Sequence, residues 1–187
     1  MLKRILYCFT VTLVLAACGG SSGTPEVQLP EGAPANIAVG SRLIGREGPA
    51  VPGEPAPDFQ YTMADGSSVR LSELRGKKVL INFWATWCEP CRSEMPDLEK
   101  AAQTYGDSLA VIGVNKGEQA DVFPAFLGEI PVSFPLVANP EGDIALAYGV
   151  VSGIPQTVFV NSDGTVASRH LAPMSYSAIS AQLDQLK

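Results

Sequence analysis

The feature that most constrains this chain is the stretch over residues 81–91, where an apolar, β-favouring run stops at two cysteines separated by two residues. A segment with helical periodicity follows at once. The pattern predicts a strand that delivers a pair of thiols to the N-terminus of a helix. A thiol held there meets the positive end of the helix dipole and free backbone N–H groups, and both favour the thiolate. The stretch therefore predicts reversible exchange between a dithiol and a disulfide.

The N-terminus has the pattern of an export signal. Lys3 and Arg4 precede an apolar run over residues 5–17, which is too short for a comfortable membrane span. The run ends in Leu-Ala-Ala-Cys at Cys18, which resembles the lipobox of bacterial lipoproteins. We expect a signal peptide over residues 1–17, a lipidated Cys18 and an extracytoplasmic domain held to a membrane by its lipid. An uncleaved signal anchor, or secretion without lipidation, is the alternative.

The four cysteines of the chain limit what the central pair can do. Cys8 would leave with the signal peptide and Cys18 would carry the lipid, so Cys88 and Cys91 have only each other as disulfide partners. A zinc site would need two further Cys or His ligands, and the chain offers one histidine, His170. Such a site would need two copies of the chain, and we expect no cofactor beyond the Cys88–Cys91 disulfide.

Composition bounds the fold and the partners. With 187 residues, the chain suits one domain of ordinary size plus appendages. Hydrophobic residues make up 46 %, which is enough for a core. The net charge of −6 and the lack of a Lys/Arg cluster argue against nucleic acid as a partner, because phosphate binding needs a basic patch.

Residues 18–57 are rich in Gly, Ser, Pro and Ala, which predicts a flexible tether. Residues 37–44 are apolar enough for a short docked strand, and the sequence leaves this open. One folded domain is expected over residues 58–187. Strand patterns cover residues 59–63, 68–71, 78–84, 108–114, 134–137, 156–160 and 165–169, and helical patterns cover residues 72–75, 92–105, 119–127, 141–148 and 175–186. This alternation predicts an α/β sandwich around a mixed sheet.

Residues 82–96, Asn-Phe-Trp-Ala-Thr-Trp-Cys-Glu-Pro-Cys-Arg-Ser-Glu-Met-Pro, resemble the active site of extracytoplasmic thioredoxin-like proteins of the TlpA/ResA/DsbE type, within the redoxin (AhpC-TSA) superfamily. Residues 57–59, 71–77 and 153–157 add matches in the right order, so the similarity covers residues 57–187. The resemblance implies a thioredoxin-like three-layer sandwich with a mixed central sheet, an N-terminal β-hairpin and a central insertion.

The two cysteines have different expected roles. Cys88, exposed at the helix N-terminus, is the expected nucleophile, and Cys91, one turn into the helix and more buried, resolves the mixed disulfide. Pro90 suits a first-turn position because no N–H partner is lost. Glu89 places a negative charge beside the sulfurs and opposes thiolate formation, whereas the helix dipole favours it. The sequence does not rank these two effects.

Four residues around the cysteines are expected to contact substrate: Trp87, Glu89, Pro90 and Ile154. The resemblance implies a cis Ile154–Pro155 peptide bond packed against the dithiol, with the Ile154 backbone free to pair with a substrate strand. A plain trans proline at a turn is the alternative for Pro155. Trp87 suits a flat recognition surface, whereas Trp84 suits the core.

The proton acceptor for the resolving thiol is an open question in this chain. Cytoplasmic thioredoxins carry a buried aspartate at the strand position of Asn82, and an amide cannot take that role. Glu118 follows a predicted strand at its carboxyl end and resembles in position a glutamate that lines the dithiol pocket of ResA-like proteins. It is either a candidate acid/base or a solvated loop carboxylate beside Lys116.

The resemblance implies a thiol-disulfide oxidoreductase that reduces protein disulfides, for example those of apocytochrome c, with electrons from a membrane thiol reductant of the DsbD/CcdA type. A thiol peroxidase is a weaker alternative, because the Pro-x-x-x-Thr-x-x-Cys frame of such enzymes would place Thr where this chain has Ala85. A third interpretation is a lipoprotein domain that only binds a partner strand beside Pro155.

Overall fold

The computed structural model describes residues 29–45 and 49–187, so the expected signal peptide, Cys18 and the first part of the tether lie outside the described residues. One eight-stranded sheet organises this part of the chain, with the strand order β3-β2-β1-β6-β5-β4-β7-β8. The strands are β1 (Ile37–Ile44), β2 (Asp58–Met63), β3 (Ser68–Arg70), β4 (Lys78–Trp84), β5 (Leu109–Asn115), β6 (Leu136–Val137), β7 (Gln156–Val160) and β8 (Val166–His170).

The sheet is mixed, as the sequence predicts. Strands β4, β5, β6 and β1 run parallel to their neighbours in that series, whereas β7 and β8 at one side and β2 and β3 at the other pair antiparallel. The central strand β4 is apolar and buried almost throughout, since helices cover both of its faces. Its carboxyl end points toward the two cysteines.

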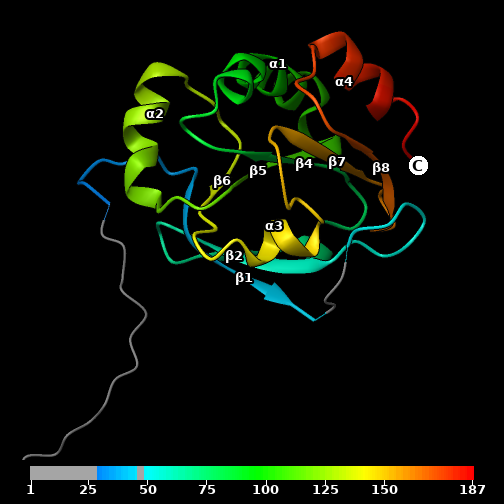
Figure 1. Ribbon diagram of the computed structural model, residues 1–187, viewed down its shortest axis with the longest axis horizontal. Helices are drawn as coiled ribbons and strands as arrows, with labels where there is room; N and C mark the ends of the chain where they lie inside the picture. Colours follow the sequence, from blue (N-terminus) through cyan, green and yellow to red (C-terminus); the bar gives the residue numbers. More distant parts are fainter. Residues whose placement is uncertain (1–28, 46–48) are drawn as a thin grey trace, which may run out of the picture.

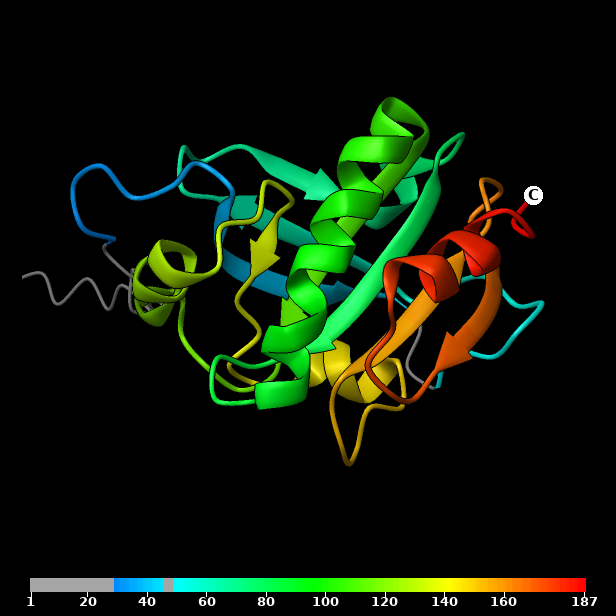
Figure 2. The ribbon, with the colours of Figure 1, turned by 90° about the horizontal axis from the view of Figure 1, so that it is seen from above.

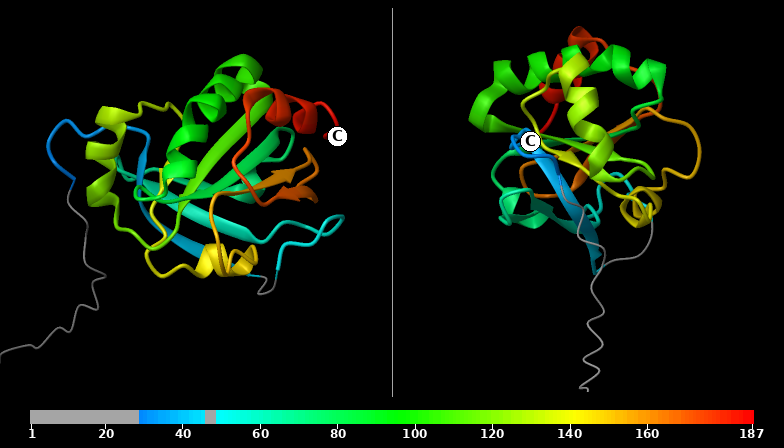
Figure 3. Two further views of the ribbon diagram at one scale, coloured as in Figure 1. Left: turned by 45° about the horizontal axis from the view of Figure 1, so that its top comes forward. Right: turned by 90° about the vertical axis from the view of Figure 1, so that its left-hand side faces the viewer.

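Helices cover both faces of the sheet and complete a three-layer sandwich (Figures 1 and 3). The helices are α1 (Glu89–Tyr105), α2 (Phe123–Glu129), α3 (Asp143–Ala147) and α4 (Tyr176–Leu183), with 3₁₀ turns η1 (Leu71–Leu74), η2 (Gly106–Ser108) and η3 (Ala120–Val122). Side chains of α1, α2 and α4 share one hydrophobic core, and those of α3 belong to a second core on the opposite face. The expected thioredoxin-like sandwich is confirmed, with β2 and β3 as its hairpin and η3, α2 and β6 as its central insertion.

The sheet begins before the expected domain start at residue 58. Strand β1 pairs antiparallel with β2 and parallel with β6, and Ile37 and Ala38 are completely buried. Residues 37–44 are therefore part of the folded domain rather than of a flexible tether, because their apolar side chains join the two cores. Residues 53–56 also pair with the β8 edge, through Gly53 N–H on Val166 O at 2.8 Å and Val166 N–H on Glu54 O at 2.9 Å.

Helix α2 begins later than the helical pattern over residues 119–127 predicts. Residues 120–122 form a 3₁₀ turn, and α2 starts at Phe123 with Pro124 in its first turn, where a proline costs no hydrogen bond. Among residues 29–45 and 49–187, no helix is both long and apolar enough to cross a membrane.

Candidate active site

The two cysteines lie at the N-terminus of α1, directly beyond the carboxyl end of β4. Cys88 is the N-cap residue of α1, in an extended conformation, and its Sγ accepts the Cys91 backbone N–H at 3.3 Å. Pro90 occupies the first turn, as its missing N–H allows. Cys88 and Cys91 are joined by a disulfide. The sulfur of Cys88 therefore sits where an N-cap oxygen normally does, at the positive end of the helix dipole.

The prediction that Cys88 is exposed is wrong for this disulfide form. Cys88 is 4 % exposed and Cys91 is completely buried. The reason is that the Cys88 sulfur is tied to the buried Cys91 sulfur and lies 3.7 Å from the carbonyl oxygen of Ile154. The residues on either side of Cys88 in the chain, Trp87 and Glu89, are more accessible.

Those neighbours are open to solvent. Trp87 is 70 % exposed and the Glu89 side chain is 90 % exposed, and Pro90 is exposed as well. Trp84, by contrast, is completely buried and packs on Phe126 with ring centroids 4.6 Å apart. The assignment of Trp87 to the surface and of Trp84 to the core is confirmed.

The loop before β7 forms the other side of the site. The Ile154–Pro155 peptide bond is cis, as the resemblance implies, and Pro155 is buried while Ile154 is half-buried. Because β7 runs antiparallel to β4, its first residues reach the edge of the sheet where β4 ends. Figure 2 shows this loop, in gold, beside the N-terminal end of α1.

Glu118 holds the turn that leads into Cys88. One carboxylate oxygen accepts the Thr86 backbone N–H at 2.7 Å and the Asn115 side-chain amide at 2.8 Å, and the other accepts the Thr86 hydroxyl. The Glu118 backbone N–H in turn donates to Asn115 Oδ1 at 3.0 Å. This arrangement differs from the interpretation of Glu118 as a solvated loop carboxylate, since both carboxylate oxygens accept hydrogen bonds from Thr86 or Asn115. Its contacts fit a residue that positions the turn.

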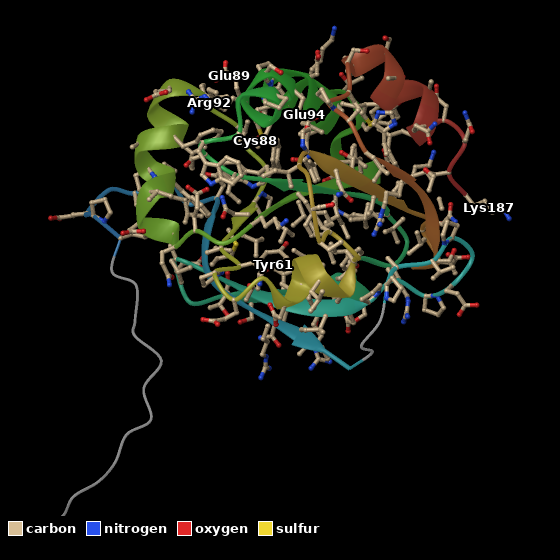
Figure 4. The ribbon with its side chains drawn as sticks, in the orientation of Figure 1. Tyr61, Cys88, Glu89, Arg92, Glu94 and Lys187 are labelled. Atoms are coloured by element: carbon tan, nitrogen blue, oxygen red, sulfur yellow. A yellow bond between two sulfur atoms is a disulfide. The ribbon has the colours of Figure 1, made fainter. Side chains whose placement is uncertain are left out.

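A second carboxylate, Glu94, lies on the buried face of the dithiol helix α1, where the sequence analysis places no functional residue. Glu94 is 2 % exposed and sits one turn after Cys91 on α1, so the two side chains neighbour each other on one helix face. Glu94 Oε1 accepts the Asn82 side-chain amide at 2.7 Å, and Oε2 accepts the Met174 backbone N–H at 2.9 Å. Figure 4 shows Glu94 further along α1 than Cys88.

Burial raises the pKa of Glu94 to about 7, although the hydrogen bonds from Met174 and Asn82 oppose the shift. A carboxyl group with that pKa changes its protonation state near neutral pH and so can accept and release a proton there. Asn82, which stands where thioredoxins have an aspartate, thus supports a carboxylate supplied by the next element. Asn82 also donates to the Thr157 hydroxyl at 3.1 Å.

The sequence contains a signal for Glu94, but a weak one. Its position falls on the apolar face that also carries Met95, Leu98 and Ala101, all of which are completely buried. A charged residue on a buried helix face is unusual unless it has partners or a function. The helical pattern over residues 92–105 rests on its apolar members alone, and it gives no role to this carboxylate.

In the part of the chain that the structure describes, no group of three or more His, Cys, Asp or Glu side chains is placed to hold a metal ion. Three groups lie around the two cysteines. Glu118 accepts hydrogen bonds from the turn before Cys88, Glu94 lies one turn after Cys91 on α1, and the Ile154 carbonyl oxygen of the cis-proline loop lies 3.7 Å from the Cys88 sulfur.

Comparison with known proteins agrees with this geometry. The AhpC/TSA family profile matches residues 52–169. The thioredoxin-like protein YneN of Bacillus subtilis (strain 168) is 38 % identical over 135 residues, which cover 71 % of this chain and 78 % of YneN. The thiol-disulfide oxidoreductase ResA of the same organism is 32 % identical over 136 residues, or 72 % of this chain and 75 % of ResA.

A solved structure gives the same result for the fold. The crystal structure of a putative thiol:disulfide interchange protein DsbE from Chlorobium tepidum superimposes with a TM-score of 0.66 and 29 % identity, covering 72 % of this chain and 96 % of that chain. Fold, site and sequence similarity together show that this chain belongs to the AhpC/TSA family.

Proposed function

We propose that this protein is an extracytoplasmic thiol-disulfide oxidoreductase of the ResA/DsbE type that reduces disulfides in other proteins. The observation that carries the proposal is the Cys88–Cys91 disulfide at the N-cap of α1, flanked by the exposed Trp87 and covered by the cis-proline loop. The name of ResA, whose sequence matches over three quarters of its length, supports the same reaction class.

The first step in this proposal uses Cys88. In the reduced protein its thiolate attacks one sulfur of a partner's disulfide. The bond between Cys88 and the partner forms as the partner's own S–S bond breaks, and the second partner sulfur leaves as a thiolate. The helix N-terminus stabilises the attacking thiolate.

The second step uses Cys91 and Glu94. The Cys91 thiol gives its proton to the Glu94 carboxylate and attacks the Cys88 sulfur, so the Cys88–Cys91 disulfide forms and the partner leaves as a dithiol. Two electrons pass from this protein to the partner. We assign proton transfer to Glu94, because it lies one turn after Cys91 on α1. We assign a positioning role to Glu118, because its hydrogen bonds go to Thr86 in the turn before Cys88.

The reducing direction is favoured by the carboxylates around the sulfurs. A couple is a strong oxidant when its reduced form is stabilised, and negative charge near a thiolate destabilises that form. Glu89 lies between the two cysteines in the chain and is exposed, and Glu94 lies one turn beyond them. The helix N-terminus acts in the opposite sense.

Trapping of the mixed disulfide tests the proposed reaction. In Cys91→Ser, Cys88 can still attack but nothing resolves the product, so a disulfide-containing peptide should remain covalently attached and be released by dithiothreitol. Cys88→Ser keeps Cys91, whose buried position should prevent attack. Equal trapping by both variants, or trapping by neither, would reject the assigned roles.

We further propose that the domain is held to a membrane through a lipid on Cys18, with electrons supplied by a DsbD/CcdA-type membrane reductant and apocytochrome c thiols among its substrates. The support is the signal-like segment and the Leu-Ala-Ala-Cys sequence over residues 15–18. Cys18→Ala should release the protein from the membrane fraction. If that variant stays with the membranes after carbonate washing, an uncleaved signal anchor replaces the lipid.

A further inference from the structure

The turn that precedes Cys88 is held by side chains from other elements. The Cys88 N–H donates to Ala85 O at 3.2 Å, which closes a turn with Thr86 and Trp87 at its centre. Glu118 accepts the Thr86 N–H and hydroxyl. The Thr86 carbonyl oxygen points the other way and accepts Arg92 Nη1 at 3.3 Å. All three polar groups of Thr86 are therefore engaged by side chains outside the turn.

Arg92 connects this turn to helix α2. Its Nη2 donates to Glu129 Oε2 at 2.6 Å, and its guanidinium lies over the Phe126 ring at 5.5 Å from the centroid. Its Nε also lies 3.8 Å from a Glu89 oxygen. Figure 4 shows Arg92 beside Glu89 at the end of α1 that lies next to α2. The Arg92 side chain is only 25 % exposed.

The segment that holds η3 and α2 therefore reaches the active-site turn from both of its ends. Glu118 lies just before η3, and Glu129 is the last residue of α2. The first contacts Thr86 directly, and the second reaches Thr86 through Arg92. A planar guanidinium suits such a bridge, since it presents several N–H donors in fixed directions.

We propose that Arg92, bridged to Glu129, is a positioning residue that keeps Cys88 at the N-cap of α1 by fixing the Thr86 carbonyl. The inference rests on the proposed function, because it concerns the same nucleophile. Cys88 follows Thr86 by two residues, so movement of the Thr86 peptide moves the sulfur relative to the Cys91 N–H. A sulfur displaced from that N–H loses the stabilisation of its thiolate.

The test uses the full chain in its reduced form and follows the alkylation rate of Cys88 by iodoacetamide against pH, with the modified peptide identified by mass spectrometry. Arg92→Met removes charge and bridge together. Arg92→Lys keeps the charge but cannot donate in two fixed directions. Glu129→Gln leaves Arg92 charged and removes its ionic partner. Glu99→Gln is the matched control, because Glu99 also joins α1 to the insertion, through Ser133 N–H at 2.7 Å, without touching Thr86.

The expected result is that Arg92→Met, Arg92→Lys and Glu129→Gln each slow the alkylation of Cys88 at neutral pH by about two- to tenfold, the size of one typical lost hydrogen bond. The pH midpoint should move upward in each, while Glu99→Gln matches the unsubstituted chain. If only Arg92→Met slowed the alkylation, the charge of Arg92 alone would set the rate, and the proposed positioning by the Arg92–Glu129 bridge would be overturned. Unchanged rates in all variants, or an equal change in Glu99→Gln, would also overturn it.

Failure of this inference is distinguishable from failure of the proposed function. The unsubstituted chain must first lose its Cys88 alkylation on mild oxidation and recover it on reduction, which depends on the disulfide and not on Arg92. If that cycle is absent, the redox function fails. If the cycle is present and the variants behave like the unsubstituted chain, only the positioning role of Arg92 fails.

Discussion

At the scale of single residues, the site contains two carboxylates that differ in surroundings and in assigned role. Glu118 is part of a hydrogen-bonded loop and contacts a turn, whereas Glu94 is buried beneath the sulfurs with Asn82 as a partner. The same carboxyl group can differ in its pKa, and so in its ability to transfer a proton, when its degree of burial differs. The pKa of Glu94, raised to about 7, makes this difference measurable.

Glu94→Gln should change how the stability of the disulfide form depends on pH. Because the pKa of Glu94 is higher in the folded than in the unfolded chain, the folded chain binds the extra proton, and the free energy of unfolding falls as pH rises toward and through 7. The loss between pH 5 and pH 8 should be roughly 2 to 3 kcal/mol and should disappear in Glu94→Gln. Urea unfolding at several pH values measures it.

Glu99→Gln serves as the control for that measurement, since Glu99 lies on the same helix but contacts the exposed Gln103 and Ser133. Its stability should follow the pH dependence of the unsubstituted chain. Parallel curves for Glu94→Gln and the unsubstituted chain would show that Glu94 is already ionised when folded, and proton transfer would then need another group.

At the scale of elements, the packing of Trp84, Phe134 and Leu136 around β5 depends on a residue with no side chain. Gly113 in β5 lies beneath Trp84, and a Cβ atom there would come within 2.9 Å of Leu136 Cδ2, 3.1 Å of Trp84 Nε1 and 3.3 Å of Phe134 Cε2. All three neighbours are buried, so none can move freely. The contact of Gly113 with Leu136 thus joins β6, the last element of the central insertion, closely to β5.

Gly113→Ala should therefore lower the free energy of unfolding by about 1 to 3 kcal/mol, the usual cost of overpacking a core. Gly128→Ala in α2 is the contrast, because no atom lies within 4 Å of its added Cβ and alanine favours a helix. That variant should be as stable as the unsubstituted chain or more so. Thermal unfolding compares the two, and equal melting temperatures would contradict the packing described for Gly113.

Most elements could be predicted from the sequence because their patterns are local. Strand β7 covers the predicted residues 156–160, and β5 and β8 differ by one residue at each end. Strand β1 could only be left open, since its partner β6 lies about a hundred residues away and no local pattern shows such pairing. The predicted helix over residues 119–127 starts before α2, because the residues of the 3₁₀ turn η3 carry the same helical spacing as α2 itself.

In the candidate site, too, features with a local pattern could be predicted, whereas contacts between residues far apart in the chain could not. The Cys88–Cys91 pair and its place at a helix start could be predicted from their spacing and surroundings. The contact of Arg92 with Glu129 could not, because the two residues are 37 positions apart and both look like surface charges in the sequence. Glu94 was missed because its burial depends on α4 and the segment before it, which supplies the Met174 N–H.

At the scale of the whole molecule, the N-terminal segment is an integral part of the sheet. Strand β1 lies between β2 and β6 and is the link between the β2–β3 hairpin and the rest of the sheet. Asn36 also donates its side-chain amide to Val132 O at 2.9 Å and to Phe134 O at 3.0 Å. These contacts tie the N-terminal segment to the central insertion.

A chain that starts at residue 58 should therefore be much less stable than one that starts at residue 29. Loss of β1 exposes buried apolar side chains such as Leu136, Val137 and Phe59, and leaves the hairpin without its neighbour. Circular dichroism and urea unfolding measure the difference. Equal unfolding midpoints for the two chains would show that β1 is an appendage and that the domain begins where the sequence first suggested.

The proposed function depends on Cys88 and Cys91 forming a reversible, reducing couple. The most direct test is the reduction potential of that couple, measured by equilibrating the protein with dithiothreitol or glutathione buffers and quantifying the free thiols. We predict one two-electron transition at a potential close to that of thioredoxin, about −270 mV. A potential near that of DsbA, about −120 mV, would make the protein an oxidant, and two thiols that persist under oxidising buffers would contradict the redox function itself.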